Sequence, residues 1–380
     1  MTLRLFTLVV AILFIFQNAD ARWANKDDQG SIIRKYYTTY KIKKDGTYIR
    51  TTEQEVEILR DDARVSDGLV RFKYKPDSES FKILEAYTLN DEKKEIVPLD
   101  TIEDKPLASD GEGFDQTNQI TLVFPDVRVG SKVFYKAERT YLVPQIEGFF
   151  SEYLYFGNDY YQDIRVQMTS ELPLYAELTD PTHGFRLSKS RHQMTLKNRR
   201  PIFRKVVDET DAILTPNTYP WILISTADSW KKFARLVIDE HEKILSSPLP
   251  KTFQHILKQA RAKKTVEDQM NTVTSELANH LRYHGDWRSV RGRNIPRELS
   301  LVAKTRFGDC KDFAALTTVI LRQLGIEAEM AWVNRSPEPD FTPDELPHSF
   351  FNHAIVHAVA NGKTYWVDPT NVASFAQGIF

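Results

Sequence analysis

Three residues near the end of the sequence have the types and the order of a nucleophile, a base and an orienting acid. Cys310 is the only cysteine in the chain, and His353 and Asp368 follow it. A cysteine thiolate attacks a carbonyl carbon, and a neighbouring imidazole takes the thiol proton and later protonates the leaving group. A carboxylate holds that imidazole in the required tautomer. These residue types predict acyl-transfer chemistry if the fold brings them together.

The residues after Cys310 predict a helix that begins at the cysteine. Apolar side chains recur at steps of three and four, at Phe313, Leu316, Ile320 and Leu324. Asp309 suits an N-cap and Gly325 suits the position just past a helix end. In the first turn the helix dipole and free N–H groups favour a thiolate, and the Cys310 N–H is a candidate donor to an oxyanion. The positive charge of Lys311 also favours a thiolate, whereas the negative charges of Asp309 and Asp312 disfavour it. We expect Asp312 to be an acidic residue of the first helical turn, stabilised by the helix dipole.

The segment from Phe350 to Thr370 predicts a hairpin that pairs His353 with Asp368. Asn361-Gly362 is a strong two-residue turn signal between alternating apolar residues. Such a turn fixes the register and places Asp368 opposite Ile355 on the facing strand. His353 and Asp368 then share one face as diagonal neighbours, about 7–8 Å apart at the backbone, within reach of a hydrogen bond. A bulge in either strand would break this relationship.

Each of these residues also has a structural interpretation. A lone cysteine is often a buried, inert hydrophobe. A strand histidine is often structural, and an aspartate at a strand end often stabilises a turn. His357 shares the face of His353 but lies opposite Trp366 and faces no carboxylate, so we interpret it as a packing or surface residue. Trp287, in the segment RYHGDW, is a candidate substrate-binding residue that would line the groove, although aromatic side chains more often pack.

The sequence predicts neither a metal nor a cofactor. His348 and His353 in HSFFNH have no thiolate or carboxylate at a recognised zinc spacing. No glycine-rich phosphate loop and no calcium-ligand loop is present. The net charge is −1 and no basic stripe carries interleaved aromatics, so we expect no nucleic-acid partner.

The chain divides into a strand-rich part and a helical part. Segments rich in β-branched and aromatic residues follow one another from about residue 31 to 207, and Asp45-Gly46 predicts a tight turn between the first two. The Pro-containing stretch 215–220 marks the expected boundary. Beyond it, helical periodicity appears over 230–244 and 266–281.

The first 21 residues have the pattern of a signal peptide. Arg4 precedes an apolar run from Leu5 to Phe16, and Ala19-Asp20-Ala21 resembles a cleavage site. The run is shorter than the about 20 residues that span a bilayer, although an uncleaved anchor is the alternative. We therefore expect a periplasmic or secreted protein with no membrane span after signal removal. Outside the cytosol a single thiol indicates an intermolecular bridge or a reactive residue.

Three motifs together resemble the core of the transglutaminase-like superfamily: GDCKD, FNHAIV and YWVDPT. The segments YKIKKDGTYIRTTEQEVEIL and FPDVRVGSKVFYKAE resemble the bacterial domain of unknown function 3857. The resemblance implies an α+β protein with an antiparallel β-sandwich over 22–220 and a papain-like core over 221–380. Similar two-domain proteins usually continue well beyond the DPT strand, so we expect either a fragment or a member without the usual tail.

The resemblance implies thioester chemistry at amide or peptide carbonyls, with Cys310, His353 and Asp368 as the catalytic residues. The leading hypothesis is an exported acyl-transfer enzyme, namely a protease, an amidase or a transglutaminase, with a peptide or protein substrate. The alternative is a catalytically silent module that keeps the fold as a clamp for envelope proteins or peptidoglycan peptides. The sequence predicts no oligomeric state.

Overall fold

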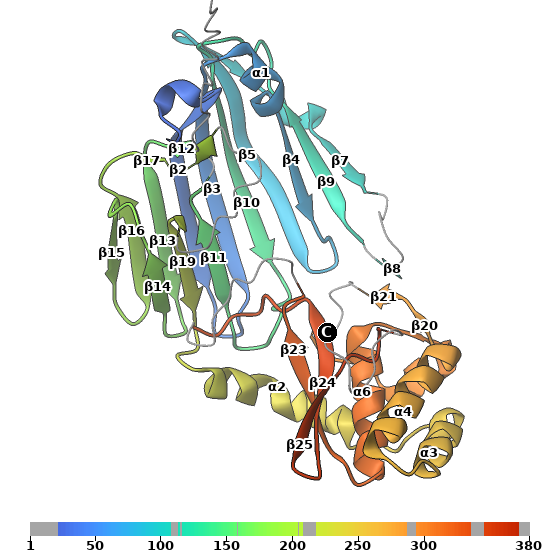
Figure 1. Cartoon of the computed structure of the whole chain (residues 1–380). Coiled ribbons are helices and arrows are strands. Elements are labelled where there is room, and N and C mark those ends of the chain that lie inside the picture. Colours follow the sequence, from blue (N-terminus) through green and yellow to red (C-terminus); the bar gives the residue numbers. More distant parts are fainter. Residues whose placement is uncertain are drawn as a thin grey trace, which may run out of the picture.

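A computed structural model describes residues 22–107, 113–114, 116–157, 159–203, 205–207, 218–286, 294–335 and 346–371. The predicted signal peptide, Trp287 and the last nine residues lie outside these ranges. Figure 1 shows a strand-rich part that carries the first half of the chain and a helical part that carries the second half. The α+β class expected from the sequence is confirmed.

The strand-rich part is organised around a ten-stranded sheet among the described residues. Along its main path the strands are β15 (Phe185–Lys189), β16 (Gln193–Asn198), β13 (Ile164–Ser170), β2 (Ser31–Ile42), β3 (Tyr48–Ile58), β10 (Lys132–Tyr141), β5 (Glu79–Asn90) and β6 (Lys93–Ile96). The short strand β12 (Tyr160–Tyr161) pairs with β2, and β17 (Ile202–Phe203) pairs with β12. Pairing is antiparallel except that β2 runs parallel to both β12 and β13, which the sequence did not predict.

Two three-stranded sheets pack against the large sheet and share its apolar core. One contains β4 (Leu69–Tyr74), β9 (Asn118–Val123) and β7 (Glu103–Pro106); the other contains β11 (Ser151–Tyr155), β19 (Trp221–Ser225) and β14 (Tyr175–Thr179). Leu122 of β9 and Ile222 of β19 are fully buried in this core. Strand β19 lies just past the expected boundary at residue 220, so the strand-rich part includes it.

Short elements complete the strand-rich part. The helix α1 (Asp61–Asp67) follows β3, and the 3-10 turns are η1 (Lys26–Asp28) and η2 (Leu99–Thr101). Two further pairs are β1 (Arg22–Trp23) with β18 (Val206–Val207) and β8 (Gly113–Phe114) with β21 (Gly285–Asp286). The second pair connects the two halves of the chain.

The predicted turn at Asp45-Gly46 is confirmed and contacts the rest of the fold closely. It joins β2 to β3, with Ile42 opposite Tyr48. Gly46 has φ +90°, and a Cβ there would lie 2.5 Å from the Phe149 carbonyl oxygen. Only glycine combines this backbone conformation with so close an approach.

The helical part surrounds a three-stranded antiparallel sheet of β23 (Glu327–Val333), β24 (His353–Ala360) and β25 (Lys363–Val367). Its helices are α2 (Trp230–Leu245), α3 (Gln254–Arg261), α4 (Val266–His280), α5 (Leu299–Thr305) and α6 (Cys310–Gln323), with η4 (Lys251–Phe253) before α3. The predicted helices over 230–244 and 266–281 are confirmed as α2 and α4. No described helix is both long enough and apolar enough to cross a bilayer.

Helix α6 is the centre of the second core. All of its residues from Lys311 to Leu321 are buried, and the helix packs against both β23 and β24. A helix that is buried on every side, as α6 is, must be enclosed by other helices and strands. Its N-terminus is therefore held firmly beside the start of β24, where His353 lies.

Candidate active site

Cys310 is the first residue of α6, as the sequence predicted. Asp309 is the N-cap, and its backbone N–H donates to the Asp312 carboxylate at 3.1 Å. The Asp309 carboxylate is ion-paired with the Lys311 ammonium, and both side chains are buried. The charges on either side of Cys310 therefore compensate each other, and neither cancels the favourable effect of the helix N-terminus on a thiolate.

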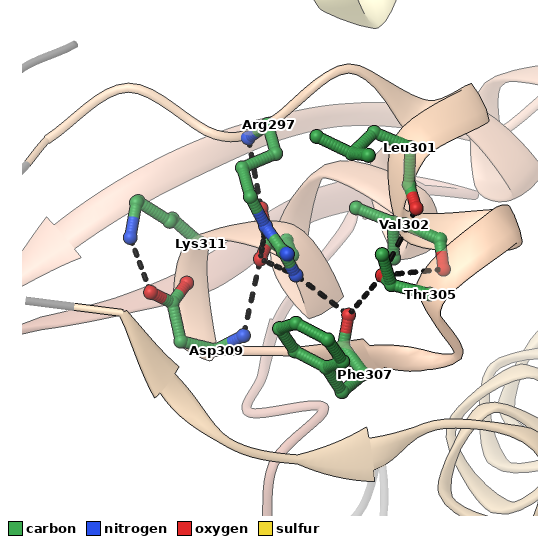
Figure 2. A network of polar contacts seen from close by, with 8 residues as sticks. Arg297, Leu301, Val302, Thr305, Phe307, Asp309 and Lys311 are labelled. Atoms are coloured by element: carbon green, nitrogen blue, oxygen red, sulfur yellow. Dashed lines mark hydrogen bonds and ion pairs between the residues drawn. The ribbon is translucent and has the colours of Figure 1, made fainter. Parts of the chain in front are cut away.

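A buried ion pair fixes the turn that leads into α6. Arg297 donates from its backbone N–H to one oxygen of Asp312 at 2.8 Å and from Nε to the other at 2.9 Å. Its Nη2 reaches the Phe307 carbonyl at 2.6 Å, as Figure 2 shows. Asp312 is completely buried. Its role is therefore larger than the first-turn charge that the sequence indicated, because it ties Arg297 to the helix start.

A short parallel pairing aligns a second segment with the cysteine. β20 (Arg282–Tyr283) pairs with β22 (Phe307–Gly308), which ends two residues before Cys310. The His284 N–H donates to the Gly308 carbonyl at 2.8 Å. Tyr283 is thereby brought beside the thiol, and burial, together with the nearby Cys310 sulfur, raises the pKa of Tyr283 to about 12.

The predicted hairpin register is confirmed. Asn361 and Gly362 both have positive φ, 52° and 73°, as a type I′ turn requires. Val356 is opposite Val367, so continuing the register places Asp368 opposite Ile355. His353 Nε2 donates to Asp368 Oδ2 at 2.8 Å. Turn chemistry alone was thus sufficient to bring these two side chains together.

The electrostatics of the pair favour a charged imidazole. The hydrogen bond to Asp368, followed by one with the Cys310 side chain, raises the pKa of His353 to about 9, although burial opposes the shift. Burial also acts to raise the pKa of the Asp368 carboxyl. The hydrogen bonds from His353 and Thr370 outweigh it and hold that pKa below its usual range. Since Nε2 is bound to Asp368, the ring nitrogen left for the thiol is Nδ1.

Comparison with known families agrees with this arrangement. The domain of unknown function DUF3857 matches residues 44–204, and the core of the transglutaminase-like superfamily matches residues 254–369. The chain is a DUF3857 domain followed by a transglutaminase-like core. The core match includes Cys310, His353 and Asp368. No curated protein matches the chain significantly.

Among solved structures, the chain is similar to a protein from Parabacteroides distasonis described as a candidate protease. The two are 16% identical, with a TM-score of 0.67, and the match covers 89% of this chain and 67% of the other. At this identity the likeness shows the fold. Two other structures overlap too little to support an argument. One is described as a TGase, with 12% identity, a TM-score of 0.24, and coverage of 56% of this chain and 52% of the other. The second is an M1 zinc metallopeptidase from Deinococcus radiodurans, with 11% identity, a TM-score of 0.24, and coverage of 51% and 42%.

A small cleft of about 80 Å³ opens at the thiol of the transglutaminase-like domain. Cys310 and His353 line it together with Tyr283, Asn294, Trp332 and Asn352. No motif or spacing in the sequence indicates these last four residues, because their positions depend on tertiary packing. Trp287, which we expected to line the groove, lies outside the described residues.

The other histidines considered in the sequence have packing positions. The rings of His357 and Trp366 lie 4.7 Å apart, which agrees with the predicted packing role of His357. His348 is buried and stacks on Phe350 at 4.9 Å, and burial lowers its pKa to about 4. His348 therefore stays neutral at ordinary pH and acts as a packing side chain.

Proposed function

We propose that this protein is a cysteine-dependent acyl-transfer enzyme that acts on amide or peptide bonds. The observation that carries the proposal is the series of contacts from Cys310 to His353 to Asp368 at the N-terminus of α6. Nucleophile, base and orienting carboxylate are the three roles that such chemistry needs. The transglutaminase-like family match supports the reaction class.

In the first half of the reaction, the Cys310 sulfur bonds to the substrate carbonyl carbon after its proton has passed to Nδ1 of His353. The developing oxyanion lies near the backbone N–H of Cys310, at the positive end of the helix. Collapse of the tetrahedral intermediate breaks the carbon–nitrogen bond. The imidazolium gives its proton to the leaving amine, and a thioester remains on Cys310.

In the second half, water or an amine attacks the thioester. His353 takes the proton of the attacking group, the carbon–sulfur bond breaks, and the thiol is restored. Water gives hydrolysis, as in a protease or amidase, and an amine gives transfer. The substrate class that we propose is a peptide or protein. The pattern of residues 1–21 supports export, so envelope proteins and peptidoglycan peptides are the substrates to test first.

The experiment is acetylation of the purified protein by p-nitrophenyl acetate, followed by intact-mass and peptide mass spectrometry. We expect rapid addition of one acetyl group at Cys310, and loss of the acetyl group when hydroxylamine or glycinamide is added. Cys310→Ser should lose the fast phase while its circular dichroism spectrum is unchanged. No fast acetylation of the native protein, or equal acetylation of both proteins, would contradict the proposal and favour the silent peptide clamp.

A further inference from the structure

Two imidazoles and a carboxylate meet on the α3–α4 pair, on residues that the proposed reaction does not use. His255 lies at the start of α3, and Glu276 and His280 lie one turn apart near the end of α4. The two Nε2 atoms are 3.1 Å apart. One nitrogen from each ring and one carboxylate oxygen all lie within 4.8 Å of one another. All three residues are half-buried.

The tautomer of His280 is set by its neighbour on the helix. Its Nδ1 donates to the Glu276 backbone carbonyl at 2.8 Å, so Nε2 carries the lone pair and is directed at His255. Histidines that bind metals usually donate their other N–H to a carbonyl or carboxylate in this way. Two nitrogens at about 2.0–2.1 Å from a tetrahedral zinc lie roughly 3.3 Å apart, close to the spacing found here.

We propose that His255, Glu276 and His280 bind a divalent transition-metal cation of the zinc type. Imidazole nitrogens select zinc and its neighbours over calcium and magnesium, which prefer all-oxygen sites. The site is separate from the Cys310 centre. It departs from the sequence-based expectation of no metal, which considered only His348 and His353. Ligands on two different helices give no linear spacing that a sequence motif could reveal.

Metal binding here would join α3 to α4 beside the candidate active site. His280 ends α4, and β20 begins two residues later. β20 pairs with β22, which leads into Cys310. A cation held by both helices therefore stiffens the base of the segment that positions Tyr283 and the thiol. Its role is structural, since none of its three ligands lines the Cys310 cleft.

The test is titration of metal-stripped protein with Zn²⁺ in competition with a chromophoric chelator. The Cys310→Ser background is used because a thiolate beside His353 and Asp368 would itself attract zinc. We expect one equivalent to bind, and His280→Gln to weaken the affinity by about 100-fold. His357→Gln, which alters a histidine outside the cluster, is the matched control and should bind normally.

Two further measurements keep the test independent of folding. Zn²⁺ should raise the melting temperature of the Cys310→Ser protein, and Glu276→Gln, which preserves the side-chain shape, should reduce that rise. Melting temperatures without metal report whether each variant is folded. If zinc does not bind, or binds equally to the His280→Gln and His357→Gln proteins, the pair of histidines is a packing contact and the proposal is wrong.

A second feature concerns the substrate and rests on the proposed function. A groove of about 390 Å³ lies between α2 and β23, and it shares Trp332 and Phe351 with the Cys310 cleft. Its other walls are mainly apolar, from Trp230, Phe233, Val237, Ile238 and Met330. Trp332 packs edge-on against Phe233 at 6.1 Å, so the shared wall is held by the aromatic cluster.

We infer that this groove receives a large apolar or aromatic side chain of the peptide substrate. Its continuity with the cleft through Trp332 and Phe351 places such a side chain near the acyl group that Cys310 attacks. Pockets of about 300–1,000 Å³ suit small ligands, so the volume fits one side chain and its flanking backbone and excludes a helix. The mainly apolar walls disfavour an acidic side chain most, because burying an unpaired charge is costly and the carboxylates of Glu242 and Glu329, which also line the groove, would repel it.

The test compares two dipeptide vinyl sulfones that differ only in carrying phenylalanine or glycine. We expect Cys310 to react at least ten-fold faster with the phenylalanine probe. Ala234→Trp, at an exposed position of α2 that lines the groove, should remove this preference. Leu236→Trp, on the same helix but outside the groove, should retain it. Equal rates with both probes would overturn the inference.

Labelling with iodoacetamide distinguishes a failure of the groove inference from a failure of the proposed function. It is too small to use the groove and reports only on the thiol. Fast iodoacetamide labelling with no preference between the probes would refute the groove and leave the proposed function standing. Slow labelling by every reagent would instead contradict the proposed function.

Discussion

Replacing His353 with alanine will lower the rate at which iodoacetamide alkylates Cys310 at pH 6 by about 100-fold. The pKa of His353 is raised to about 9, chiefly by its hydrogen bonds with Asp368 and the Cys310 side chain, so the imidazole is positively charged across neutral pH. A positive charge beside the sulfur, at the N-terminus of a helix, favours the thiolate, which is the species that iodoacetamide alkylates. The native protein should therefore still react at pH values well below the ordinary thiol pKa of about 8.5, where the variant is slow.

In the variant, the imidazole is absent and the thiol must ionise alone. Its alkylation rate should rise steadily with pH toward the ordinary thiol range, so the two proteins converge near pH 9. The measurement is the second-order rate constant from pH 5 to 9, with labelling located by mass spectrometry. His357→Ala is the matched control, since His357 lies four residues along the same strand and should not affect the rate. Identical profiles in native and His353→Ala proteins would mean that His353 does not activate the thiol.

Local rules succeeded where the decisive contacts are close in sequence. The Asn361-Gly362 turn determined the register of β24 and β25, and that register alone predicted the approach of His353 to Asp368. The apolar period after Asp309 predicted α6 and placed Cys310 in its first turn. In both cases the backbone geometry between the residues is regular, so that spacing along the chain translates directly into position.

Contacts between distant segments were beyond such rules. Tyr283 reaches the cleft because β20 pairs in parallel with β22, and two-residue strands leave no periodic signal. Trp332 lines the cleft because β23 lies beside β24. The parallel pairing of β2 with β13 likewise joins strands more than a hundred residues apart. These features follow from tertiary packing, which a single sequence does not reveal.

The Arg297–Asp312 pair shows how burial alters the meaning of a charge. From the sequence, Asp312 is an ordinary acidic residue in a first helical turn, a place where such residues commonly face solvent. In the structure it is completely buried and accepts three hydrogen bonds, two from Arg297 and one from the Asp309 N–H. These bonds support the turn before Cys310. Its partner lies fifteen residues earlier, before α5.

We expect Asp312→Ala to lower the free energy of unfolding of the transglutaminase-like domain by about 3–5 kcal/mol. The change leaves the guanidinium of Arg297 in a largely buried place without a counter-charge, because only 15% of that side chain is exposed. It also removes the acceptor for the Asp309 N–H. The measurement is urea denaturation followed by circular dichroism, with the slope of the transition used to verify that both proteins unfold to a comparable state.

Two companion variants show whether the cost comes from the isolated charge. Asp228→Ala breaks an exposed ion pair with Lys232 and should have little effect, because solvent screens such pairs. Arg297→Met combined with Asp312→Leu removes both charges and should recover a large part of the lost stability, since an apolar pair avoids the desolvation penalty. If Asp312→Ala costs no more than Asp228→Ala, the pair is not a stabilising element. If it costs about 3–5 kcal/mol and the double variant recovers it, the stability of the turn that leads into Cys310 depends on neutralising Arg297.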